Sequence, residues 1–354
     1  MIITSPKRNI LIGLFPKGQH LLMIVLFIVL VFLNACEESD DAPAPAPPVV
    51  CRLTHQTTNG TFKDGTHNRT STHAYDEKGN LLSVSINDKY EYSNGNKEIV
   101  ASSFAYTYDD DGFLVRRVSQ DTHSNKDGLT FSQTFDAIFE YKDQRLSKAN
   151  HTQTFNGMSI TYSHIYEYDS EGRLVKFSKT EDNSYTKIEY TGNRIQRITF
   201  VDAAGNSRSP YIEYNSAGQL VKSIDMEGGN TRERRYQYDA AGNLVRDEFY
   251  NNGKPYQAES YEFDDKVNPG EASNPVPKGQ PVLPDIQAYR GQKHNVTKII
   301  YFGGKGEAWA EGSTIVNTYQ YNAHNVPIEK ISKRSDFGIQ YASELTTFQY
   351  QDCN

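Results

Sequence analysis

The chain has 354 residues, with 37 Lys and Arg against 44 Asp and Glu, and a formal net charge of −7 at pH 7. No run of Lys or Arg concentrates positive charge, so no surface is suited to neutralising phosphates and we expect no nucleic-acid partner. Only 37% of the residues are hydrophobic, but 24 Tyr and 17 Phe bury large areas per residue and make an aromatic core feasible.

Residues 1–35 are predicted to be a lipoprotein signal peptide. Basic residues precede an apolar run from Leu21 to Leu33, which is short for a membrane-spanning helix. The run ends in LNAC, which resembles the lipobox of bacterial lipoproteins, where cleavage precedes a Cys that is then acylated. This resemblance implies that Cys36 carries a lipid and attaches the mature protein to a membrane. The alternative is an uncleaved anchor helix.

Residues 36–50 are predicted to be an acidic, Ala/Pro-rich tether. The segment after Cys36 reads EESDDAPAPAPPVV, which cannot bury apolar area and favours extended polyproline geometry. Its acidic cluster resembles the surface-export signal of Bacteroides-type lipoproteins. That resemblance implies an outer-membrane lipoprotein displayed on the cell surface, and the alternative is a spacer facing the periplasm.

Residues 51–354 contain a repeat, for example YEYDSEGRLVKFSKT at 166 and YQYDAAGNLVRD at 236. In five copies, Gly follows the Tyr by four residues and Leu follows it by six. Asp after the Tyr can accept backbone hydrogen bonds, and Gly can adopt the left-handed conformation that ends a type I turn. The predicted hairpin loops therefore have positive φ at the turn glycines Gly79, Gly112, Gly172, Gly218 and Gly242.

This spacing predicts consecutive antiparallel hairpins and almost no helix after residue 50. With Asp169 facing Arg173 across the loop, Tyr168 would face Leu174, Glu167 would face Val175 and Tyr166 would face Lys176. Strands of about six to eight residues are expected, with turn signals roughly every 20 to 25 residues. The fold class is all-β, a large barrel-like sheet that closes on itself, and the alternative is an open coiled sheet.

The repeat resembles the YD repeat of the Rhs family. The whole layout resembles a Bacteroides-type family of lipoproteins of unknown function with a porin-like β fold, through LNAC, VCRLT, the hairpin array, YEFDDKVNPG, HNVTKIIY and YQYQDC. The resemblance implies a sheet of joined hairpins and supplies no activity. The chain lacks the long uninterrupted array and the autoproteolytic core of toxin-enclosing Rhs shells.

The two remaining cysteines provide a test of closure. Once Cys36 carries a lipid, only Cys51 and Cys353 are left, and exported proteins can keep disulfides. Cys51 opens the first expected strand and Cys353 ends the last, and closure would make those strands antiparallel neighbours. We therefore predict a Cys51–Cys353 disulfide. The alternative is two unpaired thiols at the ends of an open sheet.

Two further features define the expected domain. Charged residues such as Glu167, Lys176 and Arg234 occur on both faces of the expected strands, which favours a soluble tethered domain over a membrane-spanning one. A Pro/Gly-rich insertion at 268–294 interrupts the repeat. Such a loop is either a mobile connection or a cap over one end of the domain.

No motif predicts catalysis, a cofactor or a metal site. The pairs His67 with His73 and His151 with His164 lack persuasive metal spacing and indicate surface or cross-strand polar roles. The carboxylates of YDDDG at 108 are explained by the hairpin turn.

Carboxylate pairs such as Asp264 with Asp265, or Glu259 with Glu262, could serve glycoside hydrolysis, but acidic exported proteins contain such pairs by chance. The expected function is non-enzymatic binding of a glycan or protein through exposed Tyr, Phe and Trp309. The alternative is a structural scaffold of the cell envelope, and a glycoside hydrolase is third.

Overall fold

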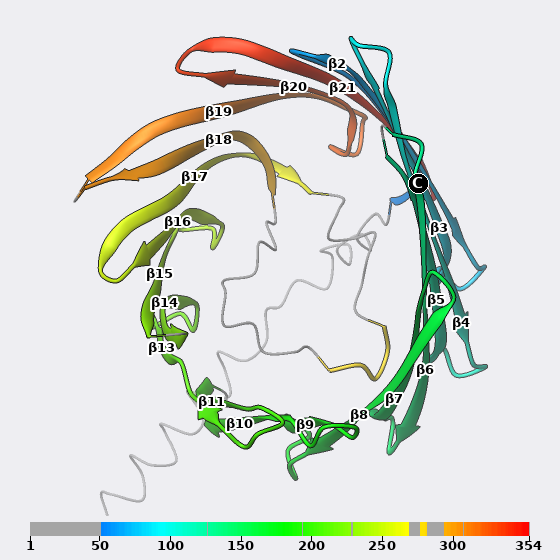
Figure 1. The fold of residues 1–354 in the computed structure, drawn as a ribbon, viewed down its shortest axis with the longest axis vertical. Coiled ribbons are helices and arrows are strands. Elements are labelled where there is room, and N and C mark those ends of the chain that lie inside the picture. The colour runs from blue at the N-terminus through cyan, green and yellow to red at the C-terminus, as the bar shows by residue number, and fades with distance from the viewer. Residues whose placement is uncertain are drawn as a thin grey trace, which may run out of the picture. The chain divides into compact units, whose positions relative to one another are not determined.

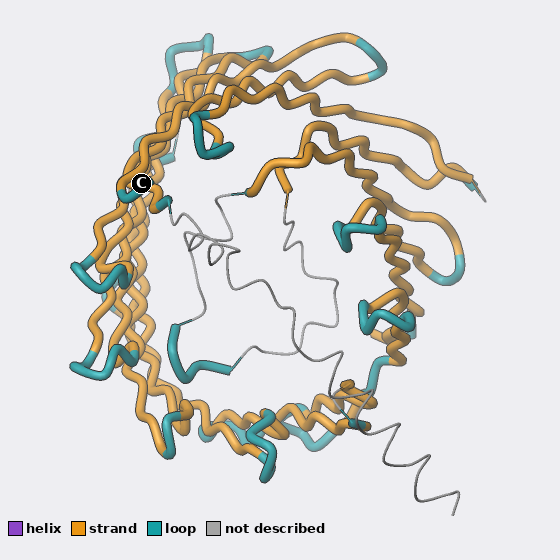
Figure 2. Tube along the Cα trace, turned by 180° about the vertical axis from the view of Figure 1, so that it is seen from behind, coloured by secondary structure: helices purple, strands orange, loops and turns teal. Residues whose placement is uncertain are grey.

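The computed structural model describes residues 51–353, apart from residues 126, 193, 228, 269–276, 282–293 and 307. The predicted signal peptide, the tether, Cys36 and most of the insertion at 268–294 lie outside the described residues. The described part consists of β-strands joined by turns and contains no helix, as predicted (Figure 2). No segment of it could therefore cross a membrane as a helix.

The described residues form twenty-one strands in one antiparallel sheet (Figure 1). In the first half these are β1 (Arg52–Phe62), β2 (Gly65–Tyr75), β3 (Leu81–Tyr92), β4 (Lys97–Tyr108), β5 (Leu114–Ser124), β6 (Thr130–Lys142), β7 (Arg145–Phe155), β8 (Met158–Tyr168), β9 (Leu174–Lys179), β10 (Tyr185–Thr191) and β11 (Arg194–Val201). The second half comprises β12 (Ser207–Arg208), β13 (Tyr211–Tyr214), β14 (Leu220–Glu227), β15 (Asn230–Tyr238), β16 (Leu244–Asn251), β17 (Lys254–Val267), β18 (His294–Lys305), β19 (Ala308–Tyr321), β20 (Pro327–Asp336) and β21 (Ile339–Gln351).

The strands are longer than predicted in much of the chain. The first eight strands have 11 to 13 residues, whereas six to eight were expected. Some later strands have the expected length, for example β9 with 6 residues and β10 with 7. The predicted lengths were wrong because stretches rich in Thr, Ser and Asn also belong to the strands, as in β1 and β2. β-Branched Thr fits a pleated, half-buried sheet well, so these stretches extend the strands.

The terminal strands pair, but hydrogen bonds do not close the sheet. β1 and β21 form an antiparallel ladder from Arg52↔Gln351 to Thr61↔Ser343. Successive strands also pair along the described chain, except that no ladder joins β12 to β13. Pro210 lies between these two short strands and has no N–H to donate. The predicted closed sheet is therefore wrong in this respect, and the observed sheet agrees with the open alternative.

The repeat forms the expected hairpin turns with one shift in register. In the turn at Asp169, the Asp169 carboxylate accepts hydrogen bonds from backbone amides, and Tyr168 pairs with Leu174 as predicted. Glu167, however, pairs with Lys176 instead of Val175, because a β-bulge on β9 adds one residue. The same shift recurs at the Tyr of the other repeats, for example between Thr107 and Tyr108.

A ladder of seven tyrosine hydroxyls joins neighbouring hairpins of the sheet. Each hydroxyl donates to the backbone carbonyl at the Leu position one repeat away, at 2.8 to 3.1 Å. Burial raises the pKa of Tyr108, Tyr168 and Tyr238 to about 12. The observed bonds run from Tyr75 to Leu53, Tyr108 to Leu81, Tyr141 to Leu114, Tyr168 to Leu146, Tyr190 to Leu174, Tyr238 to Leu220 and Tyr350 to Pro327.

The two ends of the sheet carry different kinds of turns. Because the strands are antiparallel, the repeat turns gather at one end, which we call the YD end, and the other linking turns lie at the opposite end. The buried leucines of the repeat, such as Leu114 and Leu146, lie beside the YD end. Part of the insertion packs there as well, since Gly279 accepts a hydrogen bond from the Leu146 amide and Lys278 lies over the Phe113 ring.

Candidate functional site

A cavity of about 550 Å³ lies toward the opposite end of the sheet, and we call it the His67 pocket. Side chains alternate between the two faces of a strand, so His67 and Tyr75 share one face of β2. The pocket therefore lies on the face that carries the repeat tyrosines. Its lining comprises Gly60, Thr61, Phe62, His67, Tyr90, Tyr92, Ile299, Ile315, Asn317, Lys330, Ser332, Arg334, Tyr341, Ala342, Ser343 and Glu344.

Direct cross-strand pairing builds the centre of this pocket. One row of opposed residues crosses six neighbouring strands, three from the start of the described chain and three from its end. The row reads Tyr90, His67, Gly60, Glu344, Ser332 and Asn317. The pocket therefore depends on the pairing of β1 with β21.

His67 lies between two carboxylates. Its Nε2 atom is 3.1 Å from Asp88 Oδ1, and its Nδ1 atom is 3.8 Å from Glu344 Oε1. The Tyr90 ring stacks on the imidazole, with centroids 4.5 Å apart and planes inclined by 11°. Arg69 lies 3.5 Å from the other oxygen of Asp88. These contacts fix the orientation of the imidazole and leave the Glu344 carboxylate facing the cavity.

Gly60 provides the room for this arrangement. A Cβ atom at position 60 would lie 2.7 Å from Glu344 Cγ and 3.3 Å from the Ser343 carbonyl oxygen. Gly in the middle of a strand often marks such a close approach. Without a side chain on β1, His67 from β2 and Glu344 from β21 can meet across it.

Two cations complete the polar part of the lining. Lys330 and Arg334 lie on the same face of β20, with Ser332 between them. Burial lowers the pKa of the Lys330 ammonium, and the Glu344 carboxylate acts in the opposite direction. Arg334 is exposed. The deeper cation is thus Lys330, and Arg334 lies nearer to solvent.

Aromatic rings surround the polar groups. Phe62 and Tyr92 meet edge to face at 5.9 Å, and the Tyr92 hydroxyl donates to Glu98 Oε2 at 2.9 Å. Tyr90 and Tyr341 also line the cavity and are partly exposed. The arrangement can stack on a flat apolar surface and hydrogen-bond to polar groups at its edge.

The described lining is less suited to glycoside hydrolysis. Among the described residues around the cavity, Glu344 is the one carboxylate, whereas hydrolysis generally uses two facing the same bond. The carboxylates singled out from the sequence lie elsewhere. Asp264 accepts a hydrogen bond from Tyr321, and Glu262 pairs with Lys298 at 3.0 Å.

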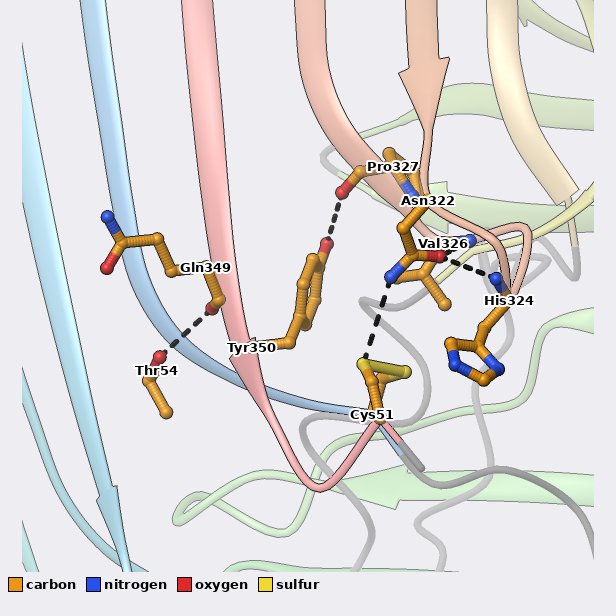
Figure 3. Close-up of a disulfide and its surroundings, with 9 residues drawn as sticks. Cys51, Thr54, Asn322, His324, Val326, Pro327, Gln349 and Tyr350 are labelled. Carbon is orange, nitrogen blue, oxygen red and sulfur yellow. Dashed lines mark hydrogen bonds between the residues drawn. A yellow bond between two sulfur atoms is a disulfide. The ribbon is translucent and has the colours of Figure 1, made fainter.

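The predicted disulfide joins Cys51 to Cys353, with a Cα–Cα distance of 4.5 Å (Figure 3). Close by, Thr54 donates a side-chain hydrogen bond to the Gln349 carbonyl at 3.1 Å (Figure 3). The disulfide links the YD ends of β1 and β21, the strands that carry Gly60 and Glu344. It therefore joins covalently the two strands whose pairing brings the N-terminal and C-terminal parts of the pocket together.

The turn glycines lie away from the pocket, at the YD end. Their φ angles fall between +82° and +89°, the left-handed region, at Gly79, Gly112, Gly172, Gly218 and Gly242. At Gly79 the Arg52 guanidinium occupies the space that a Cβ would need, and Arg145 does so at Gly172. These glycines shape the turns and the contacts between repeats.

His151 and His164 make a cross-strand polar contact, and His67 makes one with Asp88, as predicted for these three residues. His164 Nδ1 lies 3.1 Å from His151 Nε2, and burial lowers the pKa of His151 to about 4. The described part of the chain contains no group of three or more side chains that could hold a metal ion. Trp309 meets the Tyr250 ring edge to face at 5.5 Å and is outside the pocket lining.

Sequence reasoning missed the residues that define the pocket, above all Tyr90, Lys330 and Glu344. Each lies in an ordinary alternating strand and belongs to no motif. The available signal was Gly60, because a glycine within a strand suggests close approach of another group. Even that signal does not predict which residue approaches Gly60.

Comparison with known proteins gives limited matches. Residues 214–248 match the RHS repeat family model, within the region where the repeat is found. The crystal structure of a porin-like protein from Bacteroides uniformis is similar over 84% of this chain and 98% of that one, with 11% sequence identity and a TM-score of 0.36. No curated protein matches the sequence.

Proposed function

We propose that this protein is a β-repeat module of the bacterial cell envelope that binds a glycan in the His67 pocket without catalysing a reaction. The observation that carries this proposal is the combination of partly exposed aromatic rings, including Phe62 and Tyr90, with hydrogen-bonding groups in one cavity. Sugars present both an apolar ring face and a fringe of hydroxyls. An aromatic ring can stack on the first, and polar side chains can orient the second.

The different contacts of the repeat tyrosines and of Tyr90 support glycan binding. Repeat tyrosines such as Tyr108 and Tyr168 use their hydroxyls within the sheet, so they serve the scaffold. Tyr90 instead lines the cavity and stacks on His67. The tyrosine ladder also favours the second candidate, a structural scaffold of the envelope, which would need no ligand at all.

Binding to a glycan array by the purified full chain tests the proposal. We expect a positive glycan whose affinity falls at least tenfold in Tyr90→Ala, because the stacking ring is lost. Tyr256→Ala is the matched control, since Tyr256 is 58% exposed and lies outside the pocket. Circular dichroism would check that both variants fold. An array without any positive glycan, or equal losses in both variants, would favour the scaffold.

The proposed location is the outer membrane, with the lipid on Cys36 and display on the cell surface, and the alternative remains the periplasmic face. The apolar run before LNAC and the acidic residues after Cys36 support it. Cys36→Ser should abolish incorporation of radiolabelled palmitate and leave an unprocessed precursor. Normal processing and membrane attachment of that variant would contradict the assignment.

A further inference from the structure

Two positive charges face the His67 pocket without an anionic partner in the described part of the chain. Neither Lys330 nor Arg334 makes a hydrogen bond or ion pair with another described residue. Arg69, on the same face, is by contrast paired with Asp88. The pocket therefore has unused capacity to bind an anion.

The position of Lys330 makes an unpaired ammonium energetically unfavourable there. The side chain is half-buried beside the buried Thr346, its cross-strand neighbour on β21. Withdrawing an ammonium from water is unfavourable unless another charge or several hydrogen bonds compensate. Glu344 is the acidic group that acts on it, but this carboxylate makes its ion-pair contact with His67.

The local balance of charge differs from that of the whole chain. Among the described lining residues, Lys330 and Arg334 face the cavity against one carboxylate, that of Glu344, whereas the chain carries a net charge of −7. Charge of one sign in a cleft raises the local concentration of oppositely charged ligands. An anionic ligand would therefore be drawn to this part of the protein rather than to the rest of its surface.

We propose that the ligand of the His67 pocket carries an oxyanion, a carboxylate or sulfate, that is bound by the ammonium of Lys330. This inference rests on the proposed glycan function and makes the ligand class an acidic glycan. Arg334 supplies a second contact nearer to solvent. Its Cα lies about 14 Å along the strand from that of Lys330, at about 3.4 Å per residue, so the two cations suit an extended ligand better than one small ion.

The decisive comparison uses tetragalacturonate and its methyl ester, which present the same sugar rings with and without charge. Isothermal titration calorimetry with the full chain should show at least tenfold tighter binding of the acid, and added salt should remove much of the difference. In Lys330→Met the acid should lose at least tenfold in affinity, and the preference for the acid over the ester should disappear. Lys330→Arg should retain the preference for the acid.

Lys333→Met is the matched control because Lys333 is an exposed lysine of the same strand that points to the other face. It should leave both affinities unchanged. Equal binding of acid and ester, lost in Tyr90→Ala, would overturn the inference and leave the proposed function standing. An equal loss in Lys333→Met would also overturn the inference.

A third probe separates the failure of the two proposals. Inorganic sulfate should protect Lys330 from acetylation, as measured by mass spectrometry, and should leave Lys333 reactive. Protection by sulfate without affinity for either oligosaccharide would support the anion site and count against glycan binding. Absence of both protection and binding would refute both.

Discussion

Replacing Tyr108 with Phe tests the tyrosine ladder that joins the repeats. The change removes one hydroxyl and keeps the ring, so it deletes the 3.1 Å hydrogen bond to the Leu81 carbonyl with little change in packing. A hydrogen bond of this kind contributes about 1 kcal/mol to the free energy of unfolding. For a sheet of this size, with an m value of about 3 kcal/mol/M, the urea midpoint should fall by about 0.3 M.

Equilibrium unfolding in urea, followed by the fluorescence of the single Trp309, measures this change. Tyr106→Phe is the matched control. Tyr106 lies on the same face two residues earlier, and its hydroxyl makes no hydrogen bond within the described part of the chain. Its removal should therefore leave the midpoint nearly unchanged. Equal effects of the two substitutions would refute the role that we assign to the ladder.

Three further predictions concern stability. Burial raises the pKa of Tyr168 and Tyr238 to about 12, against about 10 in the unfolded chain. Their contribution to the free energy of unfolding is therefore complete below pH 10 and should be lost as the pH rises from about 10 to 12. A urea midpoint that stays constant over that range would contradict this prediction. Removing the disulfide by Cys51→Ser with Cys353→Ser should lower the unfolding free energy by about 2 to 4 kcal/mol in the same assay, and an unchanged value would show that strand pairing alone holds the termini. Gly218→Ala should lower the free energy of unfolding by about 1 kcal/mol because the φ of Gly218 is +83°. The cost should not exceed this, since the added Cβ would meet no atom within 4 Å. A stabilised variant would show that the turn relaxes.

Much of the fold follows from short-range sequence information. The spacing of Tyr168, Gly172 and Leu174 predicts the hairpin turn because each residue acts within a few positions of the others. The bulge that pairs Glu167 with Lys176 was not predictable, since an extra residue in a strand needs no special side chain. The break at Pro210 could also be suspected from sequence, but only the observed ladders show that it separates β12 from β13.

The sequence by itself determined the all-β hairpin architecture, the turn glycines and the Cys51–Cys353 pair. It could do so because turn chemistry is local and because the proposed lipidation of Cys36 leaves two cysteines to pair. Only the tertiary structure decided where a binding site could lie. His67 and Glu344 come from opposite ends of the described chain and face each other only because β1 pairs with β21 and Gly60 leaves room between them. No local pattern records such a contact, since its energy arises only after strands distant in sequence have come together.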